Sequence, residues 1–390
     1  MNTGASVLIP ARDAEHSLAK ALESAFQVET SAIFVADHGS TDKTLQVAQN
    51  YSKMQVRTID ASSCKNIAEV RQTLIDHSNS VYSVWLDADD ELLPGRVKRI
   101  ISSLENNQAD LYFDASELVQ GNRTKTLPMP SFASNNPEAH CRNFERCFLP
   151  SPGVPGVRTE FARTICFDPD FETAEDYDFI LRASMGGGKF CFDSKVGYRQ
   201  HHSPSSLSRN LDRQKKFTAR ALQKHPLEKI GRLYESNGWN ERIQAWGIVQ
   251  TATFLSEYSK AMEKLDELES SLKDPDSILE PLGIYPYPEG WMINFWKGTL
   301  CLLQGNAKES IDYLSGASKI MQAPETLNNL GVSYSILHNQ DLADNSFKEA
   351  LARKVDYLDA IENLKAECPR HITKFPLRHF DTRSSYHSES

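Results

Sequence analysis

Short apolar runs alternate with helical patterns over the first quarter of the chain. Residues 6–10, 32–36, 55–59 and 81–86 are predicted to be short buried strands. Between them, residues 17–26, 44–51 and 67–75 are predicted to be helices, and the first of these carries Leu18, Ala21, Leu22 and Ala25 on one face. This strand–helix order predicts an α/β domain with a mostly parallel central sheet and helices on both faces.

The pattern changes from about Arg209 onward, where strand signals thin out and long helical patterns begin. Residues 211–223, 239–258 and 261–272 are predicted helices, and a proline-rich stretch follows at 275–288. Beyond it, Gly298, Leu314 and Ala317 recur 33 residues later as Gly331, Phe347 and Ala350. This spacing is typical of tetratricopeptide-like helix hairpins, although Val355 stands where a proline is usual.

These patterns divide the chain into two domains and a tail. We expect an α/β domain over residues 1–215, an all-α repeat domain over 216–377 and a flexible tail over 378–390. A chain of 390 residues with 40% hydrophobic and 24% charged residues fits this division and excludes wholesale disorder.

The net charge and the cysteine pattern limit the kinds of molecule that the protein is expected to bind and the cellular compartment expected for it. A formal net charge of −9 argues against nucleic acid as a partner bound through its phosphate backbone. The seven cysteines form no C-x-x-C pair, so reduced thiols are expected, and His140, Cys141 and Cys147 match no standard zinc-finger spacing. We find no apolar run of transmembrane length and no basic start typical of a signal peptide, and we expect a cytoplasmic protein.

Polar segments follow three of the predicted strands at the point where each strand ends. They are residues 10–15 (PARDAE), 37–42 (DHGSTD) and 87–90 (DADD). The carboxyl ends of parallel strands meet at one edge of a sheet, which is where ligands bind in such folds. We therefore expect the three segments to converge on one site.

The third segment places three carboxylates within four residues, at Asp87, Asp89 and Asp90. One interpretation is a Mg²⁺ or Mn²⁺ site, because these ions take one or two protein carboxylates and fill their remaining positions with phosphate oxygens and water. The alternative is a solvated acidic turn that caps the helix beginning near Pro94. In the second segment, Asp37 could accept a hydrogen bond from a nucleotide base, while Ser40 or Thr41 caps the next helix.

Several of these segments together resemble the family 2 glycosyltransferases of the GT-A fold. The resemblance rests on VLIPARDAE, VADHGSTDKT and WLDADDELLPGRV, and continues in FDPDFETAEDYDFILR and the close YRQH, over roughly residues 5–210. Arg71 lies where that family places the arginine of an Ala-Arg-Asn element. The resemblance implies a nucleotide-sugar-binding domain and inverting sugar transfer from a nucleoside diphosphate donor, most simply UDP.

The resemblance also implies roles for individual residues. Asp89 would be the direct metal ligand, with His201 or His202 completing the metal site or contacting a phosphate. Asp176 would be the catalytic base, with Glu175 and Asp178 capping the following helix or orienting the acceptor. Donor contacts would fall on Pro10, Ala11, Arg12, Asp13, Asp37, Arg71, Asp87 and Ala88.

Two positions depart from the family pattern. His38 replaces the second aspartate of the usual Asp-Asp-Gly-Ser, which puts the identity of the base in question, and Gln72 replaces the asparagine after Arg71. The segment PARDAEHS is not the basic, glycine-rich phosphate loop that a nucleotidyltransferase would need. The loop at 150–157 is expected to shape the acceptor side.

Two classes of function remain from the sequence. The first is a metal-dependent hexosyl- or N-acetylhexosaminyltransferase acting on a glycan or polypeptide acceptor. The second is a catalytically degenerate scaffold that binds other proteins through its helical repeats. The repeats themselves would serve either a homodimer interface or acceptor binding, with the homodimer favoured.

Overall fold

The computed structural model describes residues 4–134, 136–201, 211–278, 286–376 and 387–388. Contacts divide the chain into two compact units, residues 1–226 and 227–390. The first unit thus extends beyond the boundary at 215 expected from the sequence, because helix α7 (Leu211–Gln223) packs on α6 (Glu175–Met185). Among the described residues, no helix is long and apolar enough to cross a bilayer.

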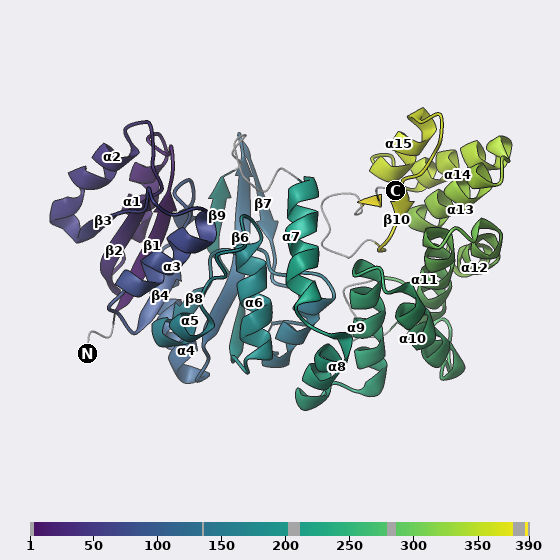
Figure 1. The fold of residues 1–390 in the computed structure, drawn as a ribbon, viewed down its shortest axis with the longest axis horizontal. Helices are drawn as coiled ribbons and strands as arrows, with labels where there is room; N and C mark the ends of the chain where they lie inside the picture. The colour runs from purple at the N-terminus through teal and green to yellow at the C-terminus, as the bar shows by residue number, and fades with distance from the viewer. Residues whose placement is uncertain (1–3, 135, 202–210, 279–285, 377–386, 389–390) are drawn as a thin grey trace. The chain divides into compact units, whose positions relative to one another are not determined.

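The first four strands form a parallel half-sheet in the spatial order β3-β2-β1-β4 (Figure 1). They are β1 (Ala5–Ala11), β2 (Thr30–Asp37), β3 (Val56–Asp60) and β4 (Tyr82–Trp85). The connecting helices are α1 (Leu18–Ala25), α2 (Thr44–Asn50) and α3 (Ile67–His77), with a short 3₁₀ turn η1 (Ser52–Met54) before β3. Ala11 is in register with Asp37, so the polar segments after β1 and β2 begin side by side.

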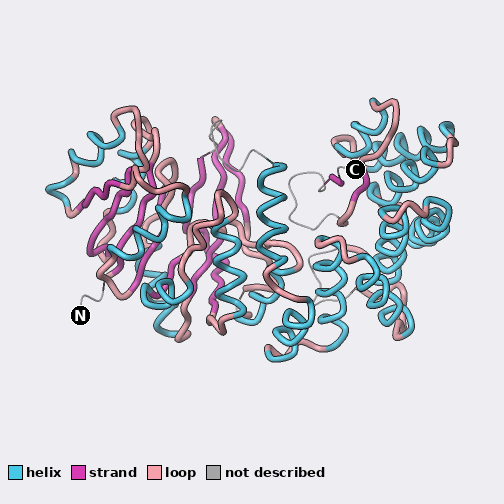
Figure 2. The backbone as a smooth tube through the Cα atoms, in the orientation of Figure 1, coloured by secondary structure: helices cyan, strands magenta, loops and turns pink. Residues whose placement is uncertain are grey.

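The rest of the sheet corrects the expectation of a mostly parallel arrangement. The sheet has nine strands, and β8 pairs antiparallel with both β4 and β6 while β5 pairs antiparallel with β9. Only β6 and β9 are parallel in this half, and β7 forms an antiparallel hairpin with β6. These strands are β5 (Glu91–Leu92), β6 (Leu111–Gln120), β7 (Arg123–Leu127), β8 (Gly156–Arg158) and β9 (Phe190–His201). The sheet therefore contains both parallel and antiparallel strand pairs, and helices flank its strands (Figure 2).

The remaining elements of the first unit are α4 (Arg96–Asn106), the 3₁₀ segment η2 (Pro137–Phe144) and α5 (Thr159–Ile165). Helix α4 packs on β4, β6, β8 and β9 through its buried face of Val97, Ile100, Ile101 and Leu104. Gly156 on β8 allows this close approach, because an added Cβ would lie 2.3 Å from Ile100 Cγ2.

The second unit is built of helices. They are α8 (Leu227–Ser236), α9 (Glu241–Phe254), α10 (Tyr258–Ser270), α11 (Glu289–Leu303), α12 (Ala307–Ile320), α13 (Pro324–Ile336), α14 (Gln340–Arg353) and α15 (Leu358–Lys365). Gly298 packs on Leu314 and Gly331 on Phe347, with added Cβ atoms only 2.6 and 2.4 Å from the partner side chains. The two hairpins α11–α12 and α13–α14 thus repeat one contact at the predicted spacing.

The end of the chain adds two short strands, β10 (Ile372–Thr373) and β11 (His387–Ser388), which pair antiparallel. Of the tail expected to be flexible, residues 378–386 and 389–390 lie outside the described residues, and 387–388 form β11.

Candidate active site

The acidic turn after β4 is held by the end of β9. The backbone N–H of Asp87 donates to the Tyr198 hydroxyl at 3.1 Å, and Asp90 Oδ1 accepts the backbone N–H of His201 at 2.7 Å. Burial raises the pKa of Asp87 to about 6, although Arg71 opposes the shift. Burial and the neighbouring Asp87 raise the pKa of Asp90 to about 8. Ala88, between them, is buried.

Arg71 on α3 joins this turn to a distant helix. It is only 5% exposed, and its Nε donates to Glu175 Oε1 at 3.0 Å while Nη2 lies 3.4 Å from Asp87 Oδ1. Its Nη1 donates to the carbonyl of Gly153 at 2.7 Å, and the guanidinium lies over the Trp85 ring at 4.9 Å from its centroid. One buried cation thus holds the two acidic clusters that the sequence separates by almost ninety residues.

The second acidic cluster begins helix α6. Ala174 enters the helix with φ +55°, a left-handed conformation that is costly for a residue with a Cβ and is often found at functional sites. Asp176 Oδ1 accepts the backbone N–H of Tyr177 at 2.7 Å. Burial raises the pKa of Asp176, and burial together with Asp176 raises the pKa of Glu175 to about 7.

Gly153 marks the point where Arg71 and the predicted base meet. A Cβ placed there would lie 3.2 Å from Arg71 Nη2 and 3.2 Å from Asp176 Oδ2. The predicted acceptor-side loop, residues 150–157, therefore runs directly beside Asp176. The structure brings Arg71, Asp87, Glu175 and Asp176 together around this loop.

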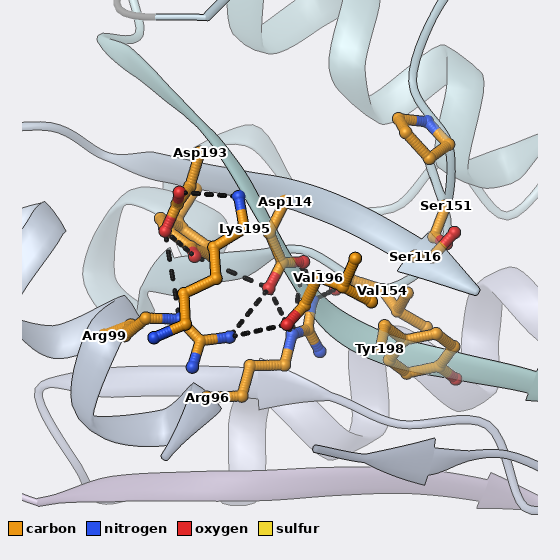
Figure 3. A network of polar contacts seen from close by, with 12 residues as sticks. Arg96, Arg99, Asp114, Ser116, Ser151, Val154, Asp193, Lys195, Val196 and Tyr198 are labelled. Carbon is orange, nitrogen blue, oxygen red and sulfur yellow. Dashed lines mark hydrogen bonds and ion pairs between the residues drawn. The ribbon is translucent and has the colours of Figure 1, made fainter. Parts of the chain in front are cut away.

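A buried polar network holds the loop at 150–157 through the carbonyl of Val154 (Figure 3). Arg96 donates to Asp114 Oδ1 at 2.9 Å and to the Val154 carbonyl at 2.8 Å, and its guanidinium lies 5.0 Å from the centroid of the Tyr198 ring. Gly197 leaves the space for Asp114, since an added Cβ would lie 1.9 Å from Asp114 Oδ2. The network thereby couples the loop to the strand that positions the acidic turn.

The predicted donor side is formed by the loops after β1 and β2. Asp13, with φ +47°, accepts the backbone N–H of Thr41 at 2.8 Å, and its own N–H donates to Ser40 Oγ at 3.1 Å. Asp37 is 8% exposed and accepts the backbone N–H of Ser40 at 3.3 Å. The N-cap role foreseen for Ser40 or Thr41 is absent, because α2 has Lys43 at its N-cap without a side-chain bond.

The remaining residues of the predicted donor side are the end of β1, Arg12, and the two positions that depart from the family pattern. Pro10 and Ala11 are the last residues of β1, and the Arg12 side chain is 62% exposed. The two departures from the family pattern are both engaged within the fold. His38 Nε2 lies 2.9 Å from the Cys64 carbonyl, and Gln72 Oε1 accepts the Phe167 N–H at 2.9 Å.

The chemistry of the turn suits a hard divalent cation. Asp89 is half-buried, burial raises its pKa, and the carboxylate makes no side-chain hydrogen bond within the described part of the chain. His201 is fixed through Nε2, 2.6 Å from Glu91 Oε1, an arrangement typical of ligating histidines whose second nitrogen is held by a carboxylate. No group of three or more potential ligands gathers in the described residues, so a cation here would need oxygens from a ligand. His202 lies outside the described residues.

Asp178 lies apart from the other acidic residues of α6. It is fully buried, and its two oxygens accept from Arg182 Nε at 2.7 Å and Lys224 Nζ at 2.6 Å. Lys224 follows α7, so Asp178 links α6 to the segment after α7. Both oxygens of its carboxylate already accept a hydrogen bond from a charged side chain. This favours a structural role over acceptor orientation.

Three residues of the site were given no individual role from the sequence. Tyr198 bridges Asp87 and Asp90, Glu91 orients His201, and Gly153 leaves space beside Arg71 and Asp176. Tyr198 begins the YRQH segment, three residues before His201, so the sequence could have marked it as a site residue. Glu91 and Gly153 gain their importance only from contacts with residues far away in the chain.

Sequence comparisons relate the chain to known glycosyltransferases. Residues 6–162 match the family model Glycosyl transferase family 2. Succinoglycan biosynthesis protein ExoO of Rhizobium meliloti is 21% identical over 299 residues, which cover 70% of this chain and 82% of ExoO. Poly(ribitol-phosphate) β-N-acetylglucosaminyltransferase TarS of Staphylococcus aureus is 22% identical over 202 residues, covering 50% of this chain and 34% of TarS.

A solved structure supports the same fold. The crystal structure of S. aureus TarS 1–349 in complex with UDP-GlcNAc aligns with a TM-score of 0.51 and 14% identity, over 91% of this chain and 93% of that one. Residues 6–162 of the first unit thus resemble the glycosyl transferase family 2 model, and the chain shares the α/β fold of this TarS structure. Asp176 and His201 lie beyond the residues that match the family model.

Proposed function

We propose that the chain is an inverting glycosyltransferase that moves a sugar from a nucleoside diphosphate donor to a nucleophile of a glycan or polypeptide. The observation that carries this proposal is the convergence of Asp87 and Asp176 on Arg71 and Gly153. Such a transfer needs a donor site beside a base, and the closeness of these residues supports placing both at this site.

The donor would lie along the ends of β1, β2 and β4. Backbone groups of residues 10–13 and the carboxylates of Asp37 and Asp87 would position the nucleoside. A Mg²⁺ or Mn²⁺ ion held by Asp89, with His201 oriented by Glu91, would neutralise the charge that develops on the departing diphosphate. Arg71 holds Asp87 in place through its ion pair, so the donor contacts stay aligned with the base.

Asp176 would be the base. Its carboxylate takes the proton of the acceptor nucleophile while the new bond to the anomeric carbon forms and the bond from that carbon to the diphosphate oxygen breaks. The elevated pKa of Asp176, caused by burial, makes the carboxylate a better proton acceptor. One base and one displacement invert the configuration at the anomeric carbon.

The named relatives suggest the substrate class. TarS is named a β-N-acetylglucosaminyltransferase and its structure holds UDP-GlcNAc, which supports a UDP donor carrying a hexosyl or N-acetylhexosaminyl group here. We further propose that the hairpins α11–α12 and α13–α14 are tetratricopeptide-like and serve a homodimer or the acceptor. The alternative of a degenerate scaffold is disfavoured because Asp89, Asp176 and Arg71 are all present and correctly spaced.

The test is a panel of UDP- and other nucleotide sugars with and without Mn²⁺, scored by thermal shift and by release of nucleoside diphosphate. At least one sugar nucleotide should stabilise the protein only with metal present, and Asp89→Asn should lose that shift. If no nucleotide sugar stabilises the protein in the presence of Mn²⁺, the proposal fails.

Asp176→Asn separates binding from chemistry. Donor stabilisation should persist, while transfer falls by about 10²–10⁴-fold because the proton acceptor is lost. Asp170→Asn is the matched control, since this nearby carboxylate is 71% exposed and pairs with Arg220 on the surface. Retained transfer in Asp176→Asn would show that another group is the base.

A further inference from the structure

Three asparagine side chains in the second unit contact one stretch of extended backbone. Asn328 on α13 donates to the carbonyl of His371 at 2.8 Å, and the other two bind both an N–H and a carbonyl. Asn363 on α15 accepts the N–H of His371 at 2.8 Å and donates to its carbonyl at 3.0 Å. Asn329 on α13 makes the same two hydrogen bonds with Thr373: it accepts the Thr373 N–H at 2.8 Å and donates to the Thr373 carbonyl at 2.9 Å. We call Asn329 and Asn363 the asparagine clamp.

The clamp reads alternate residues, as a neighbouring β-strand would. Side chains of an extended segment alternate between two faces, so a spacing of two places both clamped residues in equivalent positions. Each amide satisfies one donor and one acceptor of the segment without touching its side chain, so this part of the recognition accepts any sequence with free N–H groups. The segment itself, which contains β10, packs on α13 and α11 (Figure 1).

Sequence selectivity comes from two side chains of the held segment. The Thr373 hydroxyl is fully buried and lies 2.5 Å from both Asp359 Oδ2 and the Tyr357 hydroxyl. Phe375, two residues later, is 2% exposed, and its ring centroid lies 6.2 Å from that of Phe254. The second unit therefore surrounds the hydroxyl with polar groups and packs the aromatic ring against another ring.

We infer that this clamp is a binding site for an extended polypeptide with a hydroxyl residue followed two positions later by an aromatic one, occupied here by the chain's own residues 371–375. Backbone hydrogen bonds to side-chain amides are individually weak, because folding exchanges them for hydrogen bonds to water. The segment is also tethered, which gives it an effective concentration of about 1 mM at its site. A polypeptide of the same pattern can therefore compete when its affinity or concentration exceeds that of the tethered segment.

The ligand follows from this chemistry. An acidic residue at the hydroxyl position would be repelled by Asp359, and a proline at either clamped position would remove an N–H that the clamp binds. The site is independent of the proposed sugar transfer, because its residues all belong to the second unit.

The first test uses the unaltered full-length chain and the peptide Arg-His-Ile-Thr-Lys-Phe-Pro, which copies residues 370–376. Millimolar peptide should speed hydrogen exchange of the chain's residues 371–375, since it displaces them from the clamp. The same peptide with aspartate in place of threonine should have no effect. Unchanged exchange at saturating peptide would overturn the inference.

The second test frees the site by substitution. In a Thr373→Asp chain, the new carboxylate faces Asp359, so the segment should leave and the labelled peptide should bind at least tenfold more tightly than to the unaltered chain. Adding Asn329→Ala and Asn363→Ala should remove at least tenfold of that affinity. Equal peptide affinity for the Thr373→Asp and unaltered chains would refute the proposal, as would equal affinity with and without the two asparagines.

Discussion

Replacing Arg71 with methionine should destabilise the protein in a way that depends strongly on pH. The guanidinium is almost fully buried and pairs with Glu175 at 3.0 Å and with Asp87 at 3.4 Å. Methionine keeps the packing on Trp85 but leaves two carboxylates without their cation. Removing one partner of a buried ion pair costs about 3–5 kcal/mol, and the buried Arg71–Glu175 pair should set this penalty in the free energy of unfolding at pH 8, since the Asp87 side chain is 39% exposed and adds less.

The same penalty should shrink at lower pH. A carboxyl whose pKa is higher in the folded chain than in the unfolded chain contributes stability that is lost as the pH rises through the folded value. Asp87 and Glu175 have folded pKa values of about 6 and about 7, raised chiefly by burial, and Arg71 holds both down. At pH 5.5 both groups are largely protonated and need no cation. The penalty should then be about 1 kcal/mol, from the lost bond to the Gly153 carbonyl.

Urea denaturation at pH 8 and pH 5.5 measures both values. Arg163→Met is the matched control, because Arg163 Nη2 donates to the backbone carbonyls of Ile75 and Ser78, which do not titrate. Its ion pair with Glu160 lies at the surface, where Glu160 is 84% exposed, and such a pair contributes little. The penalty of Arg163→Met should be the same at the two pH values. Equal penalties for Arg71→Met at pH 8 and 5.5 would mean that Arg71 is retained for packing and its backbone bond, and that the acidic cluster does not depend on it.

Two further predictions concern glycines. Gly153→Ala should lower transfer about threefold to tenfold with little change in unfolding free energy, because the new Cβ crowds Arg71 and Asp176 by a few tenths of an ångström; unchanged kcat would contradict this. Gly331→Ala should destabilise the protein by about 1–3 kcal/mol, because the new Cβ overpacks against Phe347. Gly231→Ala on α8 should stabilise it by about 0.5–1 kcal/mol, because nothing lies within 4 Å of the new Cβ and alanine favours the helix. Thermal unfolding of the two variants distinguishes the two signs.

The sequence predicted the parallel half of the sheet well, because each strand there is a short apolar run between turn residues. Leu111–Gln120 carries the other half and mixes Asp114, Ser116 and Glu117 into its apolar pattern. Asp114 is buried only because Arg96 pairs with it. Such compensation comes from a distant residue, so local pattern did not reveal these strands or their antiparallel pairing.

The site shows the same division between local and distant information. Asp89 and Asp176 could be singled out because each lies in a short acidic motif. The contact of Arg71 with Glu175 spans 104 positions, and the position of Gly153 beside both depends on the path of a loop. The asparagine clamp had no local signal at all, since buried asparagines are explained only by the backbone that they hold.

The acidity of the site is itself an argument for a ligand. Asp87, Asp90, Glu175 and Asp176 all have raised pKa values caused first by burial, so the fold pays in stability to keep these groups close together. Arg71 offsets part of this cost for Asp87 and Glu175, while Asp89 at the rim keeps its oxygens free of side-chain donors within the described residues. A purely structural turn would gain stability by exchanging these carboxylates for amides. In the sugar transfer proposed above, a bound cation and the proton of the acceptor would offset this cost, which is why the clustered carboxylates favour that proposal over a purely structural turn.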